Sequence, residues 1–212
     1  CIYTMSKQAF KSTEVVKTLR DLAAWMERGA TSRDKLVVGA EHEKMVIDIN
    51  QHTAAIFDGN KGLETFLKKL AAKGSWNALT EDGRVIELRK DNCASSVSLE
   101  PAGQLEHATK VHNNVHDIAK EIEHQIEESC DVAEDLDLLL MGIGYHPLQK
   151  LQDLPRIPKA RYKNFDKYMS EMDGDEQNGL HVLYKTASTQ ANIGFENESD
   201  MVKKLRVSLA LQ

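Results

Sequence analysis

Apolar positions recur at three- and four-residue intervals in four stretches of the chain, the spacing of helices that bury one face. These stretches span residues 13–28, 63–73, 107–134 and 198–212, the third starting at His107 or shortly after it. Gly29 and Gly74 follow the first two stretches, and glycine commonly ends a helix because it adopts the backbone conformations found there. The longest stretch is expected to pack along a sheet and to turn its charged residues to solvent.

Shorter apolar or alternating stretches, bounded by turn residues, are typical of strands. They lie at residues 36–49, 84–89, 97–100, 103–106, 136–144, 180–184 and 190–195. Asp82–Gly83, a pair that commonly closes a hairpin, precedes the second of them. Strands linked by such turns, with helices that do not strictly alternate with them, predict an α+β domain with a mostly antiparallel sheet. No clean boundary divides residues 1–212, so we expect one domain with a helical N-terminal lead over residues 1–34.

Composition excludes several classes of protein. A net charge of −6 provides no basic patch for nucleic acid or an anionic membrane surface. No apolar run approaches the roughly 20 residues that a transmembrane helix needs. The chain has three cysteines without C-x-x-C spacing, which indicates a reducing compartment rather than a disulfide scaffold or a structural zinc site.

Glu41 and Glu43 lie in the strand predicted over residues 36–49. Side chains two residues apart point to the same face of a strand, so the two carboxylates project together and repel each other. A divalent cation that holds a polyphosphate would relieve this repulsion, because hard cations such as Mg²⁺ take carboxylate oxygens. The alternative is an exposed edge strand on which this spacing is accidental. Glu100 and Glu106 downstream favour the metal site, although a helix start would also favour an acid at Glu106.

The chain carries five motifs in a fixed order: EHEK, LEPAGQLE, PKARY, KTASTQANIGF and ESDMVKKLRVSLALQ. Together they resemble the plant and proteobacterial type of glutamate–cysteine ligase over residues 36–212. The resemblance implies a glutamine-synthetase-like fold, in which a curved antiparallel sheet forms a cradle lined with carboxylates and arginines. It also implies the ATP-dependent joining of glutamate to cysteine through γ-glutamyl phosphate, with Mg²⁺, as the first step of glutathione biosynthesis.

The resemblance assigns roles to individual residues. It implies catalytic roles for Arg161 and Lys185, substrate binding by Gln104, Thr189 and Gln190, and metal binding by Glu41, Glu43, Glu100 and Glu106. Lys185 stands where the family usually carries arginine, and Ala187 where it carries cysteine. Lysine keeps the charge but loses the planar fork that binds carboxylate or phosphate through two bonds. A non-catalytic or differently specific ligand-binding relative is therefore the alternative function.

The resemblance also bears on partners and location. It implies glutamate, cysteine and ATP as small-molecule partners, and a cytoplasmic location, or a plastid if the source is plant-like. Family members are longer, so residues 1–212 are expected to be part of a catalytic domain whose unpaired strand edges and exposed apolar surface favour self-association. His112 and His116, four residues apart on the predicted helix, are a second candidate metal pair, but no third ligand follows at helical spacing.

Overall fold

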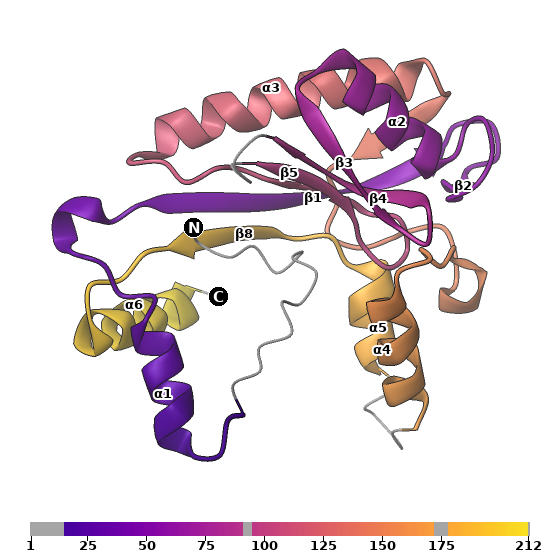
Figure 1. Cartoon of the computed structure of the whole chain (residues 1–212). Coiled ribbons are helices and arrows are strands. Elements are labelled where there is room, and N and C mark those ends of the chain that lie inside the picture. Colours follow the sequence, from indigo (N-terminus) through magenta and orange to yellow (C-terminus); the bar gives the residue numbers. More distant parts are fainter. Residues whose placement is uncertain (1–14, 91–94, 172–177, 212) are drawn as a thin grey trace.

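The computed structural model describes residues 15–90, 95–171 and 178–211, and Figure 1 shows a central sheet with helices on both sides. The strands are β1 (Val38–Asp48), β2 (Thr53–Ala54), β3 (Trp76–Glu81), β4 (Arg84–Lys90), β5 (Ser96–Leu99), β6 (Leu105–Ala108), β7 (Leu138–Met141) and β8 (Thr189–Ile193). The α-helices are α1 (Leu19–Glu27), α2 (Leu63–Lys73), α3 (Val115–Glu134), α4 (Ala160–Ser170), α5 (Asn178–Lys185) and α6 (Glu198–Leu211), and short 3-10 helices cover Arg33–Lys35 and Leu151–Asp153. The predicted α+β class is confirmed.

The strands form one sheet in the order β2-β1-β6-β5-β4-β3, with β7 and β8 also paired to β1. Every pairing between the named strands is antiparallel. The predicted turn at Asp82–Gly83 closes the hairpin between β3 and β4. Its two residues have φ values of +50° and +77°, the left-handed conformations that a two-residue hairpin turn of this type requires.

The larger core lies between the sheet and helices α2 and α3, which cover the same face in Figure 1. α2 buries the predicted apolar stripe of Leu63, Phe66, Leu67 and Leu70. These side chains meet residues such as Leu88 on the strands beneath them. Burial of apolar surface is the main favourable term in folding. This face of the sheet is therefore covered by helices and apolar side chains.

The remaining helices lie on the opposite side of the sheet. Figure 1 shows α4 and α5 below one end of it and α1 and α6 below the other. In the part of the chain that the structure describes, no residue of α1 or α6 is buried. Their exposed apolar side chains are compatible with the predicted self-association, which stays a prediction. None of the described helices combines the length and the apolar character needed to cross a membrane.

The longest helix begins later than predicted. Residues 105–108 form β6, and α3 starts at Val115. Asn114 caps the helix, because its side-chain oxygen accepts a hydrogen bond from the Asp117 backbone N–H at 3.0 Å. The predicted start at His107 or shortly after it is therefore wrong, because the helix begins eight residues later. All four residues of β6 are buried, so the strand lacks the alternation that would separate it from a helical pattern.

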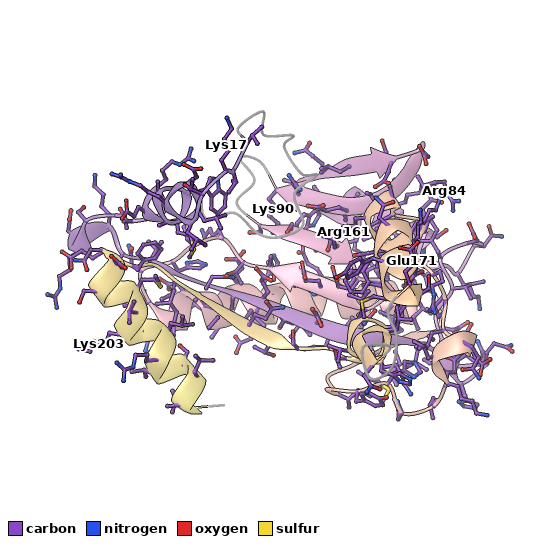
Figure 2. All side chains as sticks on the ribbon, turned by 90° about the horizontal axis from the view of Figure 1, so that it is seen from below. Lys17, Arg84, Lys90, Arg161, Glu171 and Lys203 are labelled. Atoms are coloured by element: carbon purple, nitrogen blue, oxygen red, sulfur yellow. The ribbon has the colours of Figure 1, made fainter. Side chains whose placement is uncertain are left out.

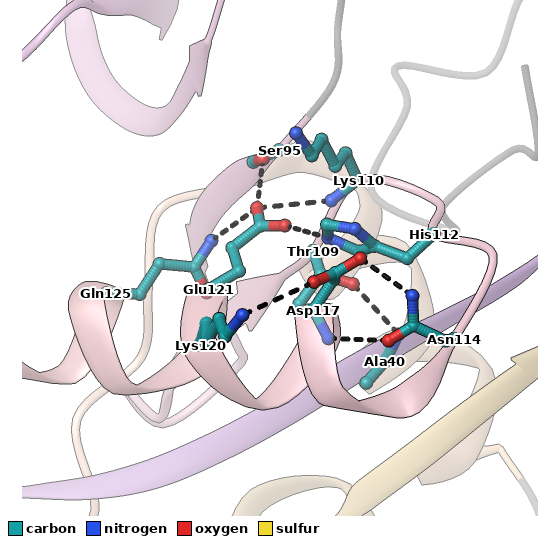
Figure 3. Close-up of polar contacts among 10 residues, drawn as sticks. All are labelled: Ala40, Ser95, Thr109, Lys110, His112, Asn114, Asp117, Lys120, Glu121 and Gln125. Carbon is teal, nitrogen blue, oxygen red and sulfur yellow. Dashed lines mark hydrogen bonds and ion pairs between the residues drawn. The ribbon is translucent and has the colours of Figure 1, made fainter.

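The predicted solvated face of α3 is also not uniformly solvated. Figure 3 shows Glu121 at the centre of a polar network that joins α3 to the end of β6 and the start of β5. Glu121 accepts a hydrogen bond from the Ser95 hydroxyl at 2.5 Å, and its other oxygen lies 2.5 Å from His112 Nε2. His112 Nε2 is therefore engaged in a polar contact with Glu121, which explains its position without a metal.

Two further predictions need correction. Residues 180–184 belong to helix α5 and not to a strand. A short apolar run fits a strand or a helix equally well. Here the helix buries Tyr184 fully, in an apolar cluster with Leu154 and beside Asp166 of α4. The first helix starts at Leu19 after the capping residue Thr18, while residues 13 and 14 lie outside the described residues.

Candidate active site

A row of acidic and hydroxyl side chains crosses the sheet on the face opposite α2 and α3. The strand registers place Glu87 of β4 beside Ser98 of β5, Ser98 beside Glu106 of β6, and Glu106 beside Glu43 of β1. Glu41 shares this face because it lies two residues from Glu43 in the same strand. The alternative of an accidental pair on an exposed edge is therefore wrong: β1 is paired on both sides at Glu41, which is buried.

The acidic face lines a pocket of about 290 Å³ between the sheet and helices α4 and α5. Its lining residues are Glu41, Glu43, Glu100, Glu106, Arg161, Tyr162, Phe165, Leu183 and Gln190. All four predicted glutamates, Arg161 and Gln190 are therefore brought together. In Figure 2, which views the molecule from the side of α4 and α5, Arg161 lies on α4 in front of the strands. The pocket combines an acidic floor with one cationic and several apolar side chains.

Arg161 and Tyr162 reach the floor of the pocket from the first turn of α4. Arg161 Nη2 donates a hydrogen bond to Glu100 Oε1 at 3.0 Å. The Tyr162 hydroxyl lies 3.1 Å from the same carboxylate oxygen and 2.9 Å from the Leu99 carbonyl oxygen. Glu100 itself sits at the tight turn between β5 and β6, where Gly103 adopts a φ of +85° that glycine tolerates best. The turn and α4 together fix the position of the Glu100 carboxylate.

β8 and Ser188, the residue before it, hold Glu41 and Glu43 from the neighbouring edge of β1. Glu43 Oε2 accepts a hydrogen bond from the Ser188 backbone N–H at 2.7 Å. Glu41 Oε1 accepts one from Asn192 Nδ2 at 3.0 Å. Each bond uses one carboxylate oxygen, and an amide oxygen in the same place could accept it equally well. These contacts therefore position the two side chains without requiring their charge.

The electrostatics of the floor are unfavourable for four ionised carboxylates. Burial, followed by the charges of Glu100, Glu41 and Glu43, raises the pKa of Glu106 to about 8. Burial also raises the pKa of Glu43, although the hydrogen bonds from Ser188 oppose the effect. Like charges on directly opposed residues of neighbouring strands destabilise a sheet. Protons or cations bound among these carboxylates would therefore stabilise the folded protein.

These residues suit Mg²⁺ by their chemistry. Carboxylate oxygens are the ligands that Mg²⁺ prefers, and it is usually held by one or two carboxylates together with waters and substrate phosphates. Among the described residues no three His, Cys, Asp or Glu side chains stand close enough together to hold a metal by themselves. Such a preformed set is not what Mg²⁺ requires. The pKa of Glu106 is raised first by burial and then by the neighbouring carboxylates, and a bound cation would offset the repulsion among them.

Three predicted site residues do not line the pocket. The Gln104 side chain is buried and donates a hydrogen bond to the Thr186 carbonyl oxygen at 2.9 Å, which ties the β5–β6 turn to the end of α5. Lys185 is buried at the end of α5, with its Nζ 4.6 Å from the centre of the Tyr145 ring. Thr189 begins β8 and is exposed. The roles predicted for Gln104, Lys185 and Thr189 stay predictions.

Three pocket residues were not predicted: Tyr162, Phe165 and Leu183. Phe165 lies four positions after Arg161 on α4, so the helical period gives a signal for it once Arg161 is chosen. Tyr162 follows at one position, a spacing that the helical period does not bring to the same face. Leu183 gives no such signal, because its segment is predicted as a strand but is helical in α5. The apolar wall of the pocket therefore depends on how α4 and α5 pack.

Comparison with known proteins agrees with this geometry. The family model for glutamate-cysteine ligase family 2 matches residues 37–212. Relatives named glutamate–cysteine ligase, chloroplastic, from Brassica juncea and Arabidopsis thaliana are each 30% identical over 207 residues, which cover 98% of this chain and 38% of the relative. Glutamate–cysteine ligase A from Oryza sativa subsp. japonica is also 30% identical, with 98% of this chain and 40% of the relative covered.

The chain thus spans about two fifths of the length of the curated relatives that it matches. Within that part, the family match includes β1, whose Glu41 and Glu43 form the centre of the acidic row, and α4, which carries Arg161. The antiparallel sheet with its acidic open face is the glutamine-synthetase-like architecture that the resemblance implied. The chain belongs to glutamate-cysteine ligase family 2.

Proposed function

We propose that the chain forms part of the catalytic cradle of an ATP-dependent glutamate–cysteine ligase. The observation that carries this proposal is the acidic row of β1 and β6, which faces Arg161 across one pocket. Family membership supports the reaction class. We further propose that residues 1–212 lie within a single catalytic domain, with residues 1–34 as its N-terminal lead, and that the protein acts in a reducing compartment, the cytoplasm or a plastid.

The proposed reaction has two steps. An oxygen of the glutamate γ-carboxylate attacks the γ-phosphorus of ATP, which forms γ-glutamyl phosphate and releases ADP. The cysteine amine then attacks the activated carbonyl carbon, phosphate leaves with the bonding electrons, and the amine gives up a proton. Phosphoryl transfer of this kind needs positioning and charge stabilisation more than covalent chemistry from the protein.

The pocket residues match these needs. Glu41, Glu43, Glu100 and Glu106 would hold Mg²⁺, which neutralises phosphate charge when it is bound. Arg161 presents a planar guanidinium to the pocket and would bind phosphate or the substrate carboxylate. Gln190 also lines the pocket and would contact substrate. The apolar wall of Phe165 and Leu183 limits the access of water on that side.

A second candidate function is a ligand-binding relative with no turnover or with another acceptor amine. It is favoured by Lys185, which replaces the arginine usual in the family and packs against the Tyr145 ring outside the pocket. Ala187 in place of the usual cysteine points the same way. Such a protein would keep the binding of metal and nucleotide and lose the final transfer to cysteine.

Release of ADP by the whole protein that carries this chain separates these functions. Glutamate–cysteine ligase activity predicts sustained ADP release that requires both glutamate and cysteine. A ligase of other specificity predicts sustained release with glutamate and a different amine, and a binding protein predicts nucleotide binding without release. Absence of both nucleotide binding and release would contradict the proposed function. The chain of 212 residues alone is expected to bind ligand but to show little or no turnover.

Replacing Arg161 with alanine should weaken the binding of ATP or glutamate by roughly 10- to 150-fold, the equivalent of about 1.5–3 kcal/mol for a hydrogen bond to a charged group. Calorimetric titration measures the change. Lys163→Ala is the matched control, because Lys163 is exposed on the same helix and does not line the pocket. Equal losses in the two variants would mean that Arg161 acts only through the net charge of α4.

A further inference from the structure

A lysine lies behind the glutamates of the pocket. Lys159 is the residue just before α4, and only 4% of its surface is exposed. Its Nζ donates a hydrogen bond to the Leu99 carbonyl oxygen at 2.7 Å. The Tyr162 hydroxyl lies 2.9 Å from the same oxygen. Leu99 ends β5 and directly precedes Glu100, so Lys159 helps to hold the segment that presents the Glu100 carboxylate.

The charge of Lys159 also acts on the acidic row. Its ammonium group attracts the carboxylates of Glu100, Glu87 and Glu106. Burial, with a smaller contribution from the charge of Arg161, lowers the pKa of Lys159 to about 8, so the group is still largely charged at pH 7. Charges interact more strongly inside a protein than in water, because the effective dielectric constant is lower there. One buried cation therefore changes the potential of the whole floor.

Lys159 does not line the pocket, so it would act on a bound cation through its charge and not by direct contact. We propose that Lys159 is a positioning residue of the ligase: its buried ammonium group offsets part of the charge of the glutamates and thereby sets how tightly the pocket takes a divalent cation. This inference rests on the proposed function, because it takes Glu41, Glu43, Glu100 and Glu106 as the metal ligands. Neither the spacing of the motifs nor the family resemblance assigned a role to Lys159.

Replacing Lys159 with methionine tests the inference, since methionine keeps an unbranched side chain and removes the charge. The glutamates then lose an internal cation. Mn²⁺, a paramagnetic substitute for Mg²⁺, is expected to bind on the order of tenfold more tightly at pH 7. The measurement is the electron paramagnetic resonance signal of the free ion. A role in packing alone predicts the opposite sign, because a displaced Glu100 carboxylate would weaken the site.

Three further variants make the test specific. Lys163→Met removes the same charge from an exposed position of α4 and should leave Mn²⁺ affinity nearly unchanged, because exposed charges are screened. Lys159→Gln keeps a hydrogen-bond donor and decides the question if the methionine variant fails to fold. Adding Glu43→Gln to Lys159→Met should abolish the gain, which would place the ion at the glutamates.

The outcomes separate the inference from the function on which it rests. Tighter Mn²⁺ binding by both Lys159 variants, with Lys163→Met at the wild-type level, supports the role of Lys159. If wild-type protein binds Mn²⁺ and the Lys159 variants bind it equally or more weakly, the role of Lys159 is overturned and the proposed function stands. If the wild-type protein binds neither Mn²⁺ nor nucleotide, the proposed function fails and the inference fails with it.

Discussion

Replacing Glu43 with glutamine is expected to weaken the binding of Mg²⁺ together with ATP by at least about 100-fold. Loss of a residue that only supports a metal ligand already costs roughly 10- to 100-fold in affinity, and Glu43 is proposed as a ligand itself. Its carboxylate lies at the centre of the acidic row, opposite Glu106 in the β1–β6 ladder. Calorimetric titration with ATP, in the presence and absence of Mg²⁺, measures the loss.

The fold should survive this change. Glutamine has nearly the same shape as glutamate, and its amide oxygen can still accept the hydrogen bond that the Ser188 N–H donates to Glu43. Glu127→Gln is a matched control, because Glu127 is exposed on α3, on the other side of the sheet. Circular dichroism and thermal unfolding should be similar for both variants. Mg²⁺-dependent ATP binding by Glu43→Gln at the wild-type level would show that the acidic row is not the metal site.

The sequence predicts the features of this site that depend only on residues close together in the chain. The alternation of β1 places Glu41 and Glu43 on one face, and this needs only the period of a strand. It does not predict that Glu106 lies opposite Glu43, because that register joins residues far apart in the chain. The register depends on the hydrophobic face of the sheet, since a slip by one residue would turn Leu105 and His107 toward the pocket and Glu106 into the core.

The errors share a physical cause. β6 is central in the sheet and buried along its whole length, so its four residues show no alternation and merge with the helical pattern that follows. α5 carries an apolar run short enough for either type of element, and contacts with Leu154 and neighbouring residues fix it as a helix. Both cases are decided by tertiary packing, which overrides local pattern.

The same limit explains why the pocket wall and Lys159 were not predicted. A lysine just before a helix is ordinarily expected to be exposed to solvent. Nothing in its spacing shows that the Leu99 carbonyl oxygen will lie 2.7 Å from the Lys159 Nζ. Burial turns an ordinary charge into one that acts on the site. Residues that work through others are therefore the part of a site least visible to sequence reasoning.

Glu106 leads to a prediction about stability. Its pKa is raised from an ordinary value of 4.5 to about 8, first by burial and then by the neighbouring carboxylates. A raised pKa means that the folded protein binds this proton more tightly than the unfolded protein does. The associated stability is fully present below about pH 4.5 and is lost as the pH rises through about 8. Over that range the loss is on the order of 3–5 kcal/mol.

Glu106→Gln should remove this pH dependence, because the amide is neutral at every pH and can still meet the Ser98 hydroxyl, which lies 3.4 Å from Glu106 Oε1. Without divalent cations, the variant is expected to match the wild-type protein at pH 5 and to exceed its free energy of unfolding at pH 8.5. Urea unfolding at both pH values measures the difference, and other titrating groups largely cancel in the comparison.

Mg²⁺ should act on the two proteins in the opposite direction. At pH 8.5 the ion can neutralise an ionised Glu106 in the wild-type floor, whereas the amide of Glu106→Gln is a weaker ligand and brings no charge to be neutralised. Added Mg²⁺ is therefore expected to stabilise the wild-type protein more than the variant, in proportion to the logarithm of its concentration above the dissociation constant. Equal stabilisation of both proteins by Mg²⁺ would mean that Glu106 is not a metal ligand of this site. An equal fall in stability from pH 5 to 8.5 would mean that Glu106 is not the acid whose raised pKa is lost on unfolding.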